Sequence, residues 1–447
     1  MVTRRFESTG TKPCARVSVR ALMAVCSYCE DICTQAVVCV LVMAFAPITF
    51  AVETAKVLPK GIFRARLISA QSEKISDNVN ENGQLEPFAN SLNTSVTVKD
   101  LANKDPRVVD LVNALNNIES GLGDNLMGSN LYSNMTLNIR TFIPALEYGA
   151  TDKLSLGVRF PIVTRKVSAN FSAESINNAA YAAAQTGSLS PDLTAALQQF
   201  SAQSFDTNMY VKSIFTDKGY DAPASFEKTE MGDMELGGKY NFFNNQIFYA
   251  TTLVGIRAPT GSTPSMTHIF DKGSGGGAWA MALTTYQEYF PTKHISFGAS
   301  QKWTHYFPDT AKRAVPKDEY DSLPSLLPQD GQVQKVTRTQ GEKVEAELSS
   351  KLHFRDSDFT AWTAYQFMAK GADSYNGPGD LYYQGLSTKS EQMSHSAELG
   401  VGYSSVNAFR RKEFAVPLQL ELMYNNTLAG KNVARLNYVR LDVLVYF

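Results

Sequence analysis

The sequence predicts an all-β protein, a transmembrane antiparallel β-barrel of about twelve strands with helical segments in long extracellular loops. Three observations predict it: apolar and polar residues alternate along many segments, these segments are long, and the links between them alternate in length. In GDMELGGKYNFF, the apolar Leu236 and Tyr240 alternate with the charged Glu235 and Lys239. Successive side chains of a strand point to opposite faces, so such a segment has one apolar and one polar face.

The alternating segments define the individual strands. They are predicted at about 61–70, 131–144, 154–166, 232–243, 246–258, 278–290, 293–307, 341–354, 358–370, 393–405, 413–426 and 433–447. A tilted membrane-crossing strand needs about 9–11 residues, whereas strands of soluble proteins usually have about 5–6. Nearly all of the predicted strands are therefore long enough to cross a bilayer.

The links between strands alternate between short and long. Short links are LEYGATDK, NN, PT, RDS and NAFRRK, and long ones lie near 71–130, 167–231, 259–277, 308–340 and 371–392. Short turns at one end and long loops at the other are typical of bacterial outer-membrane barrels, in which an even strand count returns both ends of the barrel to the periplasmic side. Apolar spacing in PRVVDLVNALNNIESG, and an Ala, Leu and Gln-rich stretch within 167–231, favour helix in two of the long loops.

The last strand ends in YVRLDVLVYF, with an apolar alternate row that includes Val443, Val445 and Phe447. A sheet in hydrocarbon must close on itself, so we expect this strand to pair with the first and to turn that row toward lipid. The aromatic terminus also resembles the signal read by the bacterial barrel-insertion machinery. Interfacial aromatic girdles are expected from Tyr289, Phe290, Phe354, Phe359 and Trp362 at one rim and from Trp303, Tyr306 and Phe307 at the other.

The N-terminal region has the pattern of a secretory signal peptide, predicted to span 1–51 and to leave a barrel domain of 52–447. Basic residues precede the apolar stretch 36–46, and cleavage is predicted between Ala51 and Val52. An uncleaved anchor over 32–52 is the alternative, and translation could start at Met1 or Met23. All five cysteines lie in this region, and its Cys-x-x-Cys spacing could also indicate a metal cluster, but no second ligand pair accompanies it.

Charge patterning predicts a polar, charged lumen. The chain has 42 Lys and Arg against 43 Asp and Glu, so it shows no basic footprint for nucleic acid. Alternation assigns these charges to the lumen: Arg64, Arg66, Arg140, Arg159, Lys239, Arg257, Lys302, Lys343, Lys351, Arg440, Glu235, Glu345, Glu347, Glu398, Glu421 and Asp442. Their basic surplus would favour anions. The alternative is that these charges only pair with one another and fill a plugged barrel.

Candidate catalytic motifs are weak, and the sequence predicts no enzyme, no cofactor and no metal site. HISFGAS places His294 and Ser296 on one strand, as in barrel phospholipases, but the context expected after the serine is missing. His395 and Glu398 have no supporting motif. The glycine-rich GSGGG lacks the strand, helix and Gly-Lys that surround a phosphate-binding loop.

Several segments resemble outer-membrane proteins of the meta-pathway phenol-degradation family, which is loosely related to the long-chain fatty acid transporters. They are ALEYGATDKLSLGVRFPIVTRK, MGDMELGGKYNFF, TTLVGIRAPTG and SGGGAWAMALTTYQEYF. The resemblance implies uptake of small hydrophobic or aromatic compounds. Fatty acid transporters carry an N-terminal hatch, but here the first strand begins soon after the predicted cleavage site, so any plug is expected from 71–130 or 167–231.

The sequence therefore predicts a transport barrel for small solutes in the outer membrane of a Gram-negative bacterium. The alternative is a structural or surface-binding outer-membrane protein with a filled lumen. The expected partners are outer-membrane lipid, the barrel-insertion machinery and an unidentified small solute, and the barrel is expected to be monomeric. A soluble barrel or sandwich would give the terminal apolar row no function.

Overall fold

The structure is a computed structural model of the 447-residue chain. Apart from a few isolated positions, it describes residues 54–90, 93–97, 106–118, 127–175, 219–222, 224–268, 270–318, 333–354 and 358–447. The predicted signal peptide with Ala51 and Val52, and the predicted helices of the 167–231 loop, lie outside the described residues. In the part described, no helix is long and apolar enough to cross a membrane.

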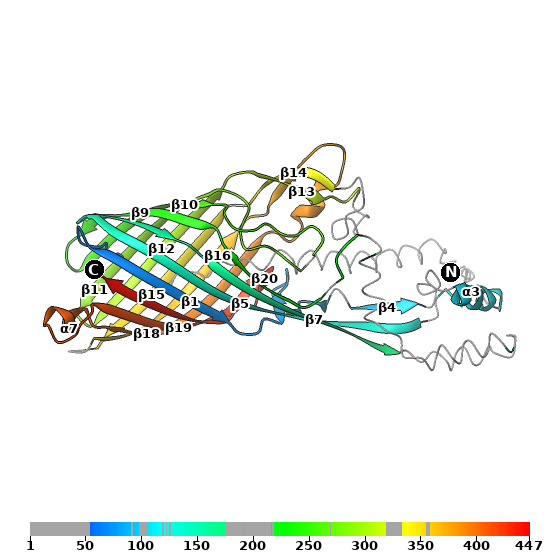
Figure 1. Ribbon diagram of the computed structural model, residues 1–447, viewed down its shortest axis with the longest axis horizontal. Coiled ribbons are helices and arrows are strands. Elements are labelled where there is room, and N and C mark those ends of the chain that lie inside the picture. Colours follow the sequence, from blue (N-terminus) through cyan, green and yellow to red (C-terminus); the bar gives the residue numbers. More distant parts are fainter. Residues whose placement is uncertain are drawn as a thin grey trace, which may run out of the picture.

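The chain folds into a closed antiparallel barrel of twelve strands (Figure 1), which confirms the predicted fold class and strand count. The barrel segments are β1 Phe63–Ser72, β5 Met127–Thr151, β6 Leu154–Arg159, β7 Ile162–Ser175, β8 Phe226–Met231, β9 Met234–Asn244, β10 Phe248–Ala258, β11 Ala280–Thr292, β12 Ile295–Tyr306, β15 Lys343–His353, β16 Phe359–Lys370, β18 Gln392–Ser404, β19 Leu418–Lys431 and β21 Tyr438–Tyr446. The first strand, β1, pairs with both the second, β5, and the last, β21, which closes the sheet.

Two barrel strands are interrupted in their middle. Phe160 and Pro161 separate β6 from β7, and Gly232 and Asp233 separate β8 from β9. Proline has no N–H to donate to a ladder, so a strand breaks or bends where it occurs. β5 pairs with β6 over one part of its length and with β7 over the other, so β6 and β7 count as one strand of the barrel.

The outer face of the barrel is apolar, the arrangement of a barrel that crosses a lipid bilayer. Along β21, Val439 and Leu441 are 46% and 42% exposed, whereas their neighbours Arg440 and Asp442 are buried inside. Terminal Phe447 stacks on Phe63 of β1 with ring centroids 5.8 Å apart. The terminal row Val443, Val445 and Phe447 thus lies on the lipid side, and its role as an insertion signal stays a prediction.

The aromatic girdles form only in part as predicted. Tyr289, Phe354, Phe359, Trp303 and Phe307 are exposed on the outer face. In contrast, Trp362 and Tyr306 are buried and Phe290 lines the lumen, so their predicted place in the girdles is wrong. Aromatic residues near a strand end can occupy either row of the alternation, and their type alone does not reveal which.

Short turns gather at one end of the barrel and long loops at the other, as predicted (Figure 1). LEYGATDK is mostly strand, because β5 continues to Thr151. NAFRRK is not a tight turn, because it contains the helix α7, Val406–Arg410. The helix predicted from PRVVDLVNALNNIESG is confirmed as α3, Pro106–Ile118. The RDS turn lies outside the described residues.

Small elements of the long loops gather at the long-loop end. Strands β2 Asp77–Val79, β3 Leu85–Pro87 and β20 Val433–Ala434 form one small sheet, and β13 Asp309–Ala314, β14 Val333–Thr339 and β17 Ser374–Asn376 form another. β4 Thr94–Thr97 pairs with β5, and η4 Tyr383–Ser387 is a 3₁₀ helix. Val79 and Val433 pack on Met368 of β16, so the first small sheet is held against the barrel wall.

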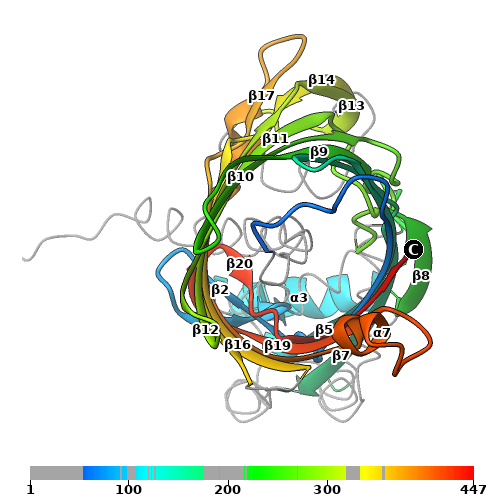
Figure 2. The same cartoon turned by 90° about the vertical axis from the view of Figure 1, so that its left-hand side faces the viewer.

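Residues 54–62, which precede β1, turn into the barrel at the short-turn end. Figure 2 shows this segment in dark blue crossing the opening. We call residues 54–60 the strap. The strap is thus a segment inside the lumen in addition to the loops 71–130 and 167–231, from which any plug was predicted. Much of these two loops lies outside the described residues, so that source of a plug stays a prediction. No sequence pattern predicts this position of the strap, because a few residues without periodicity look like an ordinary lead-in to a strand.

Candidate functional site

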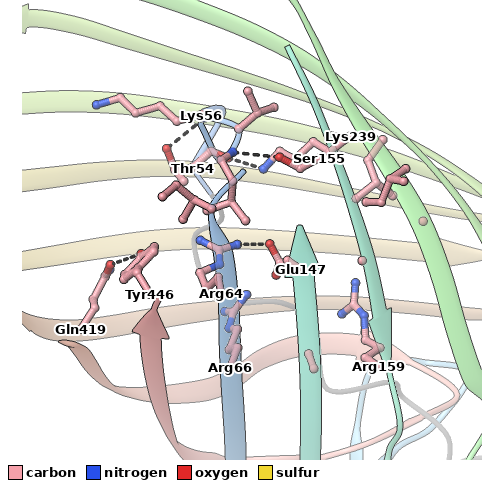
Figure 3. Close-up of a pocket in the computed structure, with 18 of the residues that line it drawn as sticks. Thr54, Lys56, Arg64, Arg66, Glu147, Ser155, Arg159, Lys239, Gln419 and Tyr446 are labelled. Atoms are coloured by element: carbon pink, nitrogen blue, oxygen red, sulfur yellow. Dashed lines mark hydrogen bonds and ion pairs between the residues drawn. The ribbon is translucent and has the colours of Figure 1, made fainter. Parts of the chain in front are cut away.

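A cavity of about 1050 Å³ occupies the short-turn half of the lumen. Most of its wall comes from β1, β5, β6, β9, β10, β11 and β12, together with the strap and α7, and single residues or pairs come from β15, β18, β19 and β21. Figure 3 shows the strap residues Thr54 and Lys56 beside the inward side chains of these strands. The side chains of an eight-stranded barrel can fill its interior, whereas a barrel of twelve strands is wider and leaves space wherever its inward side chains do not meet.

The strap is held in the lumen by side chains of four strands. Thr54 donates a hydrogen bond of 2.8 Å to Glu288, and the Leu58 N–H donates one of 2.8 Å to Ser155. Thr251 donates to the Ala55 carbonyl, and the Lys239 ammonium donates to the Thr54 carbonyl. These bonds satisfy main-chain groups of the strap that would otherwise be buried without partners.

Lys56 in the strap rests on aromatic rings. Its ammonium lies 4.5 Å from the ring centroid of Phe290 and 5.1 Å from that of Tyr249. A cation over an aromatic face is attracted by the ring quadrupole. The strap is thus fixed by both polar and cation–π contacts at the short-turn end of the cavity.

The inward charges form groups in which two cations share one carboxylate. Glu235 of β9 accepts Arg257 at 2.8 Å and Arg159 at 3.3 Å. Each such group keeps one positive charge, because a single carboxylate cannot neutralise two cations. Glu235 therefore positions the two arginines without removing the positive charge of this wall.

The same arrangement recurs at two other places in the lumen. Glu345 binds Lys343 at 2.8 Å and Lys302 at 3.1 Å. On β21, Asp442 binds Arg440 at 2.7 Å and Arg66 of β1 at 2.6 Å, across the seam that closes the barrel. Arg64 and Glu147 form a simple pair between β1 and β5 (Figure 3).

The cavity lining as a whole is basic. Nine lining residues are Lys or Arg and three are Glu. The cations are Lys56, Arg64, Arg66, Arg159, Lys239, Arg257, Lys302, Lys351 and Arg410, and the acids are Glu147, Glu235 and Glu288. Because charges around a cavity with low-dielectric walls are poorly screened, this surplus makes the electrostatic potential in the cavity positive.

The wall formed by β6, β9, β10 and β11 has a transverse row of very small residues, and we call it the open wall. Gly157 pairs with Gly237, Gly237 with Gly255, and Gly255 with Ala282. All four line the cavity. Residues directly opposite in neighbouring strands face the same side, so this row itself places no side chain larger than a methyl group on the inner face of four adjacent strands.

The wall formed by β16, β18 and β19 is filled, and we call it the packed wall. Trp362 packs on Met423, and its indole N–H donates 2.9 Å to the buried Glu398. The Gln366 amide donates to Glu347 at 3.0 Å and accepts from Asn425 at 2.9 Å. Side chains here satisfy one another and leave little space.

The predicted lumen charges lie almost entirely inside the barrel. Eight line the cavity: Arg64, Arg66, Arg159, Glu235, Lys239, Arg257, Lys302 and Lys351. Another six are buried against the inner wall: Lys343, Glu345, Glu398, Glu421, Arg440 and Asp442. Glu347 accepts from the buried Gln366.

Arg140 departs from the prediction. It is exposed and donates to the exposed Gln71, its register partner on β1. The inward row of β5 is the one that contains Thr141 and Glu147, so Arg140 falls on the outer row. Glu147 and Glu288, which the prediction missed, occupy inward positions that strict alternation along β5 and β11 would have identified.

The serine and histidine motifs do not assemble into a catalytic site. Ser296 pairs with His353, not with His294, at 3.3 Å, and this pair lies at the cavity rim. His395 is bonded to Tyr365 on the exposed face, away from Glu398. Among the described residues, no group of three His, Cys, Asp or Glu is placed to hold a metal ion.

Comparisons with known proteins bear on the fold. An outer-membrane channel from Pseudomonas putida F1 matches with a TM-score of 0.50 at 12% identity, over 89% of this chain and 100% of that chain. Two further structures are less similar. The CymD monoaromatic hydrocarbon channel has a TM-score of 0.29 and 8% identity, over 87% of this chain and 88% of that chain. The NanC porin has a TM-score of 0.29 and 7% identity, over 71% of this chain and 97% of that chain. No protein family and no curated sequence matches the chain. The chain therefore has the fold of a bacterial outer-membrane barrel.

Proposed function

We propose that this protein is a channel that carries small solutes across the outer membrane of a Gram-negative bacterium. The observation that supports it most directly is the cavity of about 1050 Å³ inside a closed barrel, lined by charged and polar side chains together with apolar ones such as Leu253 and Phe290. A barrel with a purely structural role has no need for a cavity of this size. The role is non-enzymatic, and the Ser296 and His353 pair has no assigned part in it.

The proposal includes how the protein reaches its place. Residues 1–51 serve as a cleaved signal peptide, and the barrel-insertion machinery recognises the terminal row Val443, Val445 and Phe447. The barrel acts as a monomer, because the pairing of β1 with β21 closes its sheet within the one chain. The strap then lies at the periplasmic mouth and narrows it.

Planar-bilayer recording tests the channel function. The purified barrel is compared with a variant that lacks residues 54–58, which removes most of the strap but leaves the whole of β1. We expect stepwise KCl conductance from the intact protein and a conductance increase of about twofold or more in the variant, because the strap occupies part of the mouth. Absence of current from both proteins, each shown to be folded, contradicts the proposal.

A surface-binding protein is the second candidate. β5 extends over 25 residues, and its outer part carries β4 beyond the barrel (Figure 1). Such an extension offers a surface for a partner. If binding were the main role, shortening the outer parts of β5 and β7 together would abolish adhesion to a partner. Neither the intact protein nor this variant would then show KCl conductance or solute flux.

A further inference from the structure

The row Gly157, Gly237, Gly255 and Ala282 leaves a flat strip of main chain facing the cavity. Glycine weakens a strand by about 0.5–1 kcal/mol relative to alanine. In a strand interior it often marks a place where another backbone or a ligand approaches closely. Three glycines in register therefore need a reason.

Packing supplies no reason for glycine at Gly255. A Cβ added there would be 3.5 Å from both the Leu236 carbonyl and the Leu253 side chain, which is ordinary contact. The strap supplies none either, because its bonds reach Ser155, Lys239, Thr251 and Glu288, which lie nearer the short-turn end of their strands than the row does. Glu147 lies against Gly157, where an added Cβ would be 3.2 Å from its side chain, and Leu253 borders Gly237 as well as Gly255. Beside these two side chains, the strip faces the cavity.

Cations flank the strip on both sides along the strands. Arg159 and Arg257, which share Glu235, stand one inward position beyond the row toward the long-loop end. On the other side, Lys239 follows Gly237 by one inward position and Lys302 stands on β12 opposite Thr284. Tyr286 adds an aromatic ring there, with the Lys239 ammonium 4.5 Å from its centroid.

We propose that this strip binds a small organic carboxylate with a flat apolar body, held between the two arginines and the two lysines. The inference rests on the proposed channel function and names its solute class. A flat body can approach bare main chain closely, whereas a puckered or branched one cannot. The net positive charge beside the strip attracts one carboxylate and repels a protonated amine. A neutral molecule of the same shape lacks this attraction and should bind more weakly than the anion.

Four probes of similar size separate charge from shape. Benzoate is flat and anionic, cyclohexanecarboxylate is puckered and anionic, benzyl alcohol is flat and neutral, and benzylamine is flat and cationic. We expect benzoate to block the KCl current of single channels at concentrations several-fold lower than cyclohexanecarboxylate and at least about tenfold lower than the other two, equivalent to about 1.4 kcal/mol. Equal block by all four, or stronger block by benzylamine, overturns the inference.

Two glycine variants locate the site. Gly255→Leu fills the strip and should abolish benzoate block, and Gly255→Ala should weaken it if the leucine variant fails to fold. The control is Gly238→Leu, which adds the same side chain on the outer face of β9, where a Cβ meets only Leu156 and Leu154. Benzoate block that Gly255→Leu leaves unchanged, or that Gly238→Leu removes equally, contradicts the site.

Equilibrium binding separates the site from the channel function. Benzoate binding to the detergent-solubilised folded barrel is measured by calorimetry for the intact protein and for Gly255→Leu. Binding without any KCl current contradicts the channel function but supports the site. KCl current with no benzoate binding and no block contradicts the site and leaves the channel function standing.

Discussion

The open wall and the packed wall are built from strands with the same alternation, yet one borders a cavity and the other is filled. Both contain inward glycines. In the packed wall, a Cβ on Gly400 would lie 2.2 Å from the Trp362 ring, so the glycine makes room for a tryptophan. In the open wall, a Cβ on Gly255 would have only ordinary contacts.

This difference shows that the role of a glycine in a barrel strand depends on what occupies the space beside it. At Gly400 the space is taken by Trp362, whose N–H in turn satisfies Glu398. At Gly255 the space belongs to the cavity and its basic lining. The packed wall therefore contributes mainly to stability, and the open wall provides the space for solute.

The largest expected effect is the loss of Trp362. Trp362→Ala removes a buried ring and leaves Glu398 without that donor, so we expect it to lower the free energy of unfolding by about 3–5 kcal/mol. Urea unfolding of the barrel in lipid vesicles measures this. The control, Leu253→Ala in the open wall, should cost less than half as much, and an equal cost would remove the distinction between the walls.

The two glycines provide the next comparison. Gly400→Ala forces a methyl group into the Trp362 ring, and overpacking of this kind costs about 1–3 kcal/mol. Gly255→Ala should be neutral or slightly stabilising, because alanine is favoured over glycine in strands. Urea midpoints of the two variants test this, and a Gly255→Ala variant less stable than Gly400→Ala would contradict it.

Loosening the strap should affect current more than stability. The double variant Thr251→Val with Glu288→Gln weakens the hydrogen bonds between the strap and the open wall. Each of these bonds contributes about 0.5–1.5 kcal/mol. We expect more frequent openings to the larger conductance level seen after deletion of residues 54–58. Single-channel recordings that show no such level in the double variant would mean that the strap is held by other contacts.

The smallest expected effect is a pH response of the 259–279 loop, outside the barrel lumen. Burial opposes ionisation of Asp271, but hydrogen bonds from Lys228 and the Gly273 N–H, with the nearby Arg165, outweigh it and lower its pKa below the ordinary 3.8. The ionised form thus stabilises the loop at pH values above the ordinary pKa. This contribution is lost as pH falls through the lowered pKa.

Hydrogen exchange of the loop amides at acid pH measures that response. Exchange should quicken as the pH falls below 3.8, after correction for the intrinsic rate, while the strand amides of β10 remain protected. Asp271→Asn should show the faster exchange already at neutral pH. Unchanged protection in that variant would show that the loop is held by its other bonds.

The sequence carried most of the fold because period-two alternation and loop lengths are local signals. The strands and most of the lumen charges could be assigned from the sequence, because a charged residue in an alternating segment marks the row that faces away from lipid. The prediction of side-chain orientation failed where residue type was misleading: Arg140 is charged but points outward, and Trp362 is aromatic but points inward. The strap and the cation pairs on Glu235 could not be predicted, because they depend on contacts between residues far apart in the chain.

The most direct test of the basic channel is its reversal potential in a tenfold KCl gradient. The cavity lining has nine cations against three acids, which predicts that chloride is the more permeant ion. The reversal potential should therefore lie on the side of the chloride equilibrium potential and not on that of potassium. Lys239→Gln and Lys302→Gln together should move that potential toward zero. A folded barrel that prefers potassium, or whose selectivity ignores these two lysines, would contradict the account.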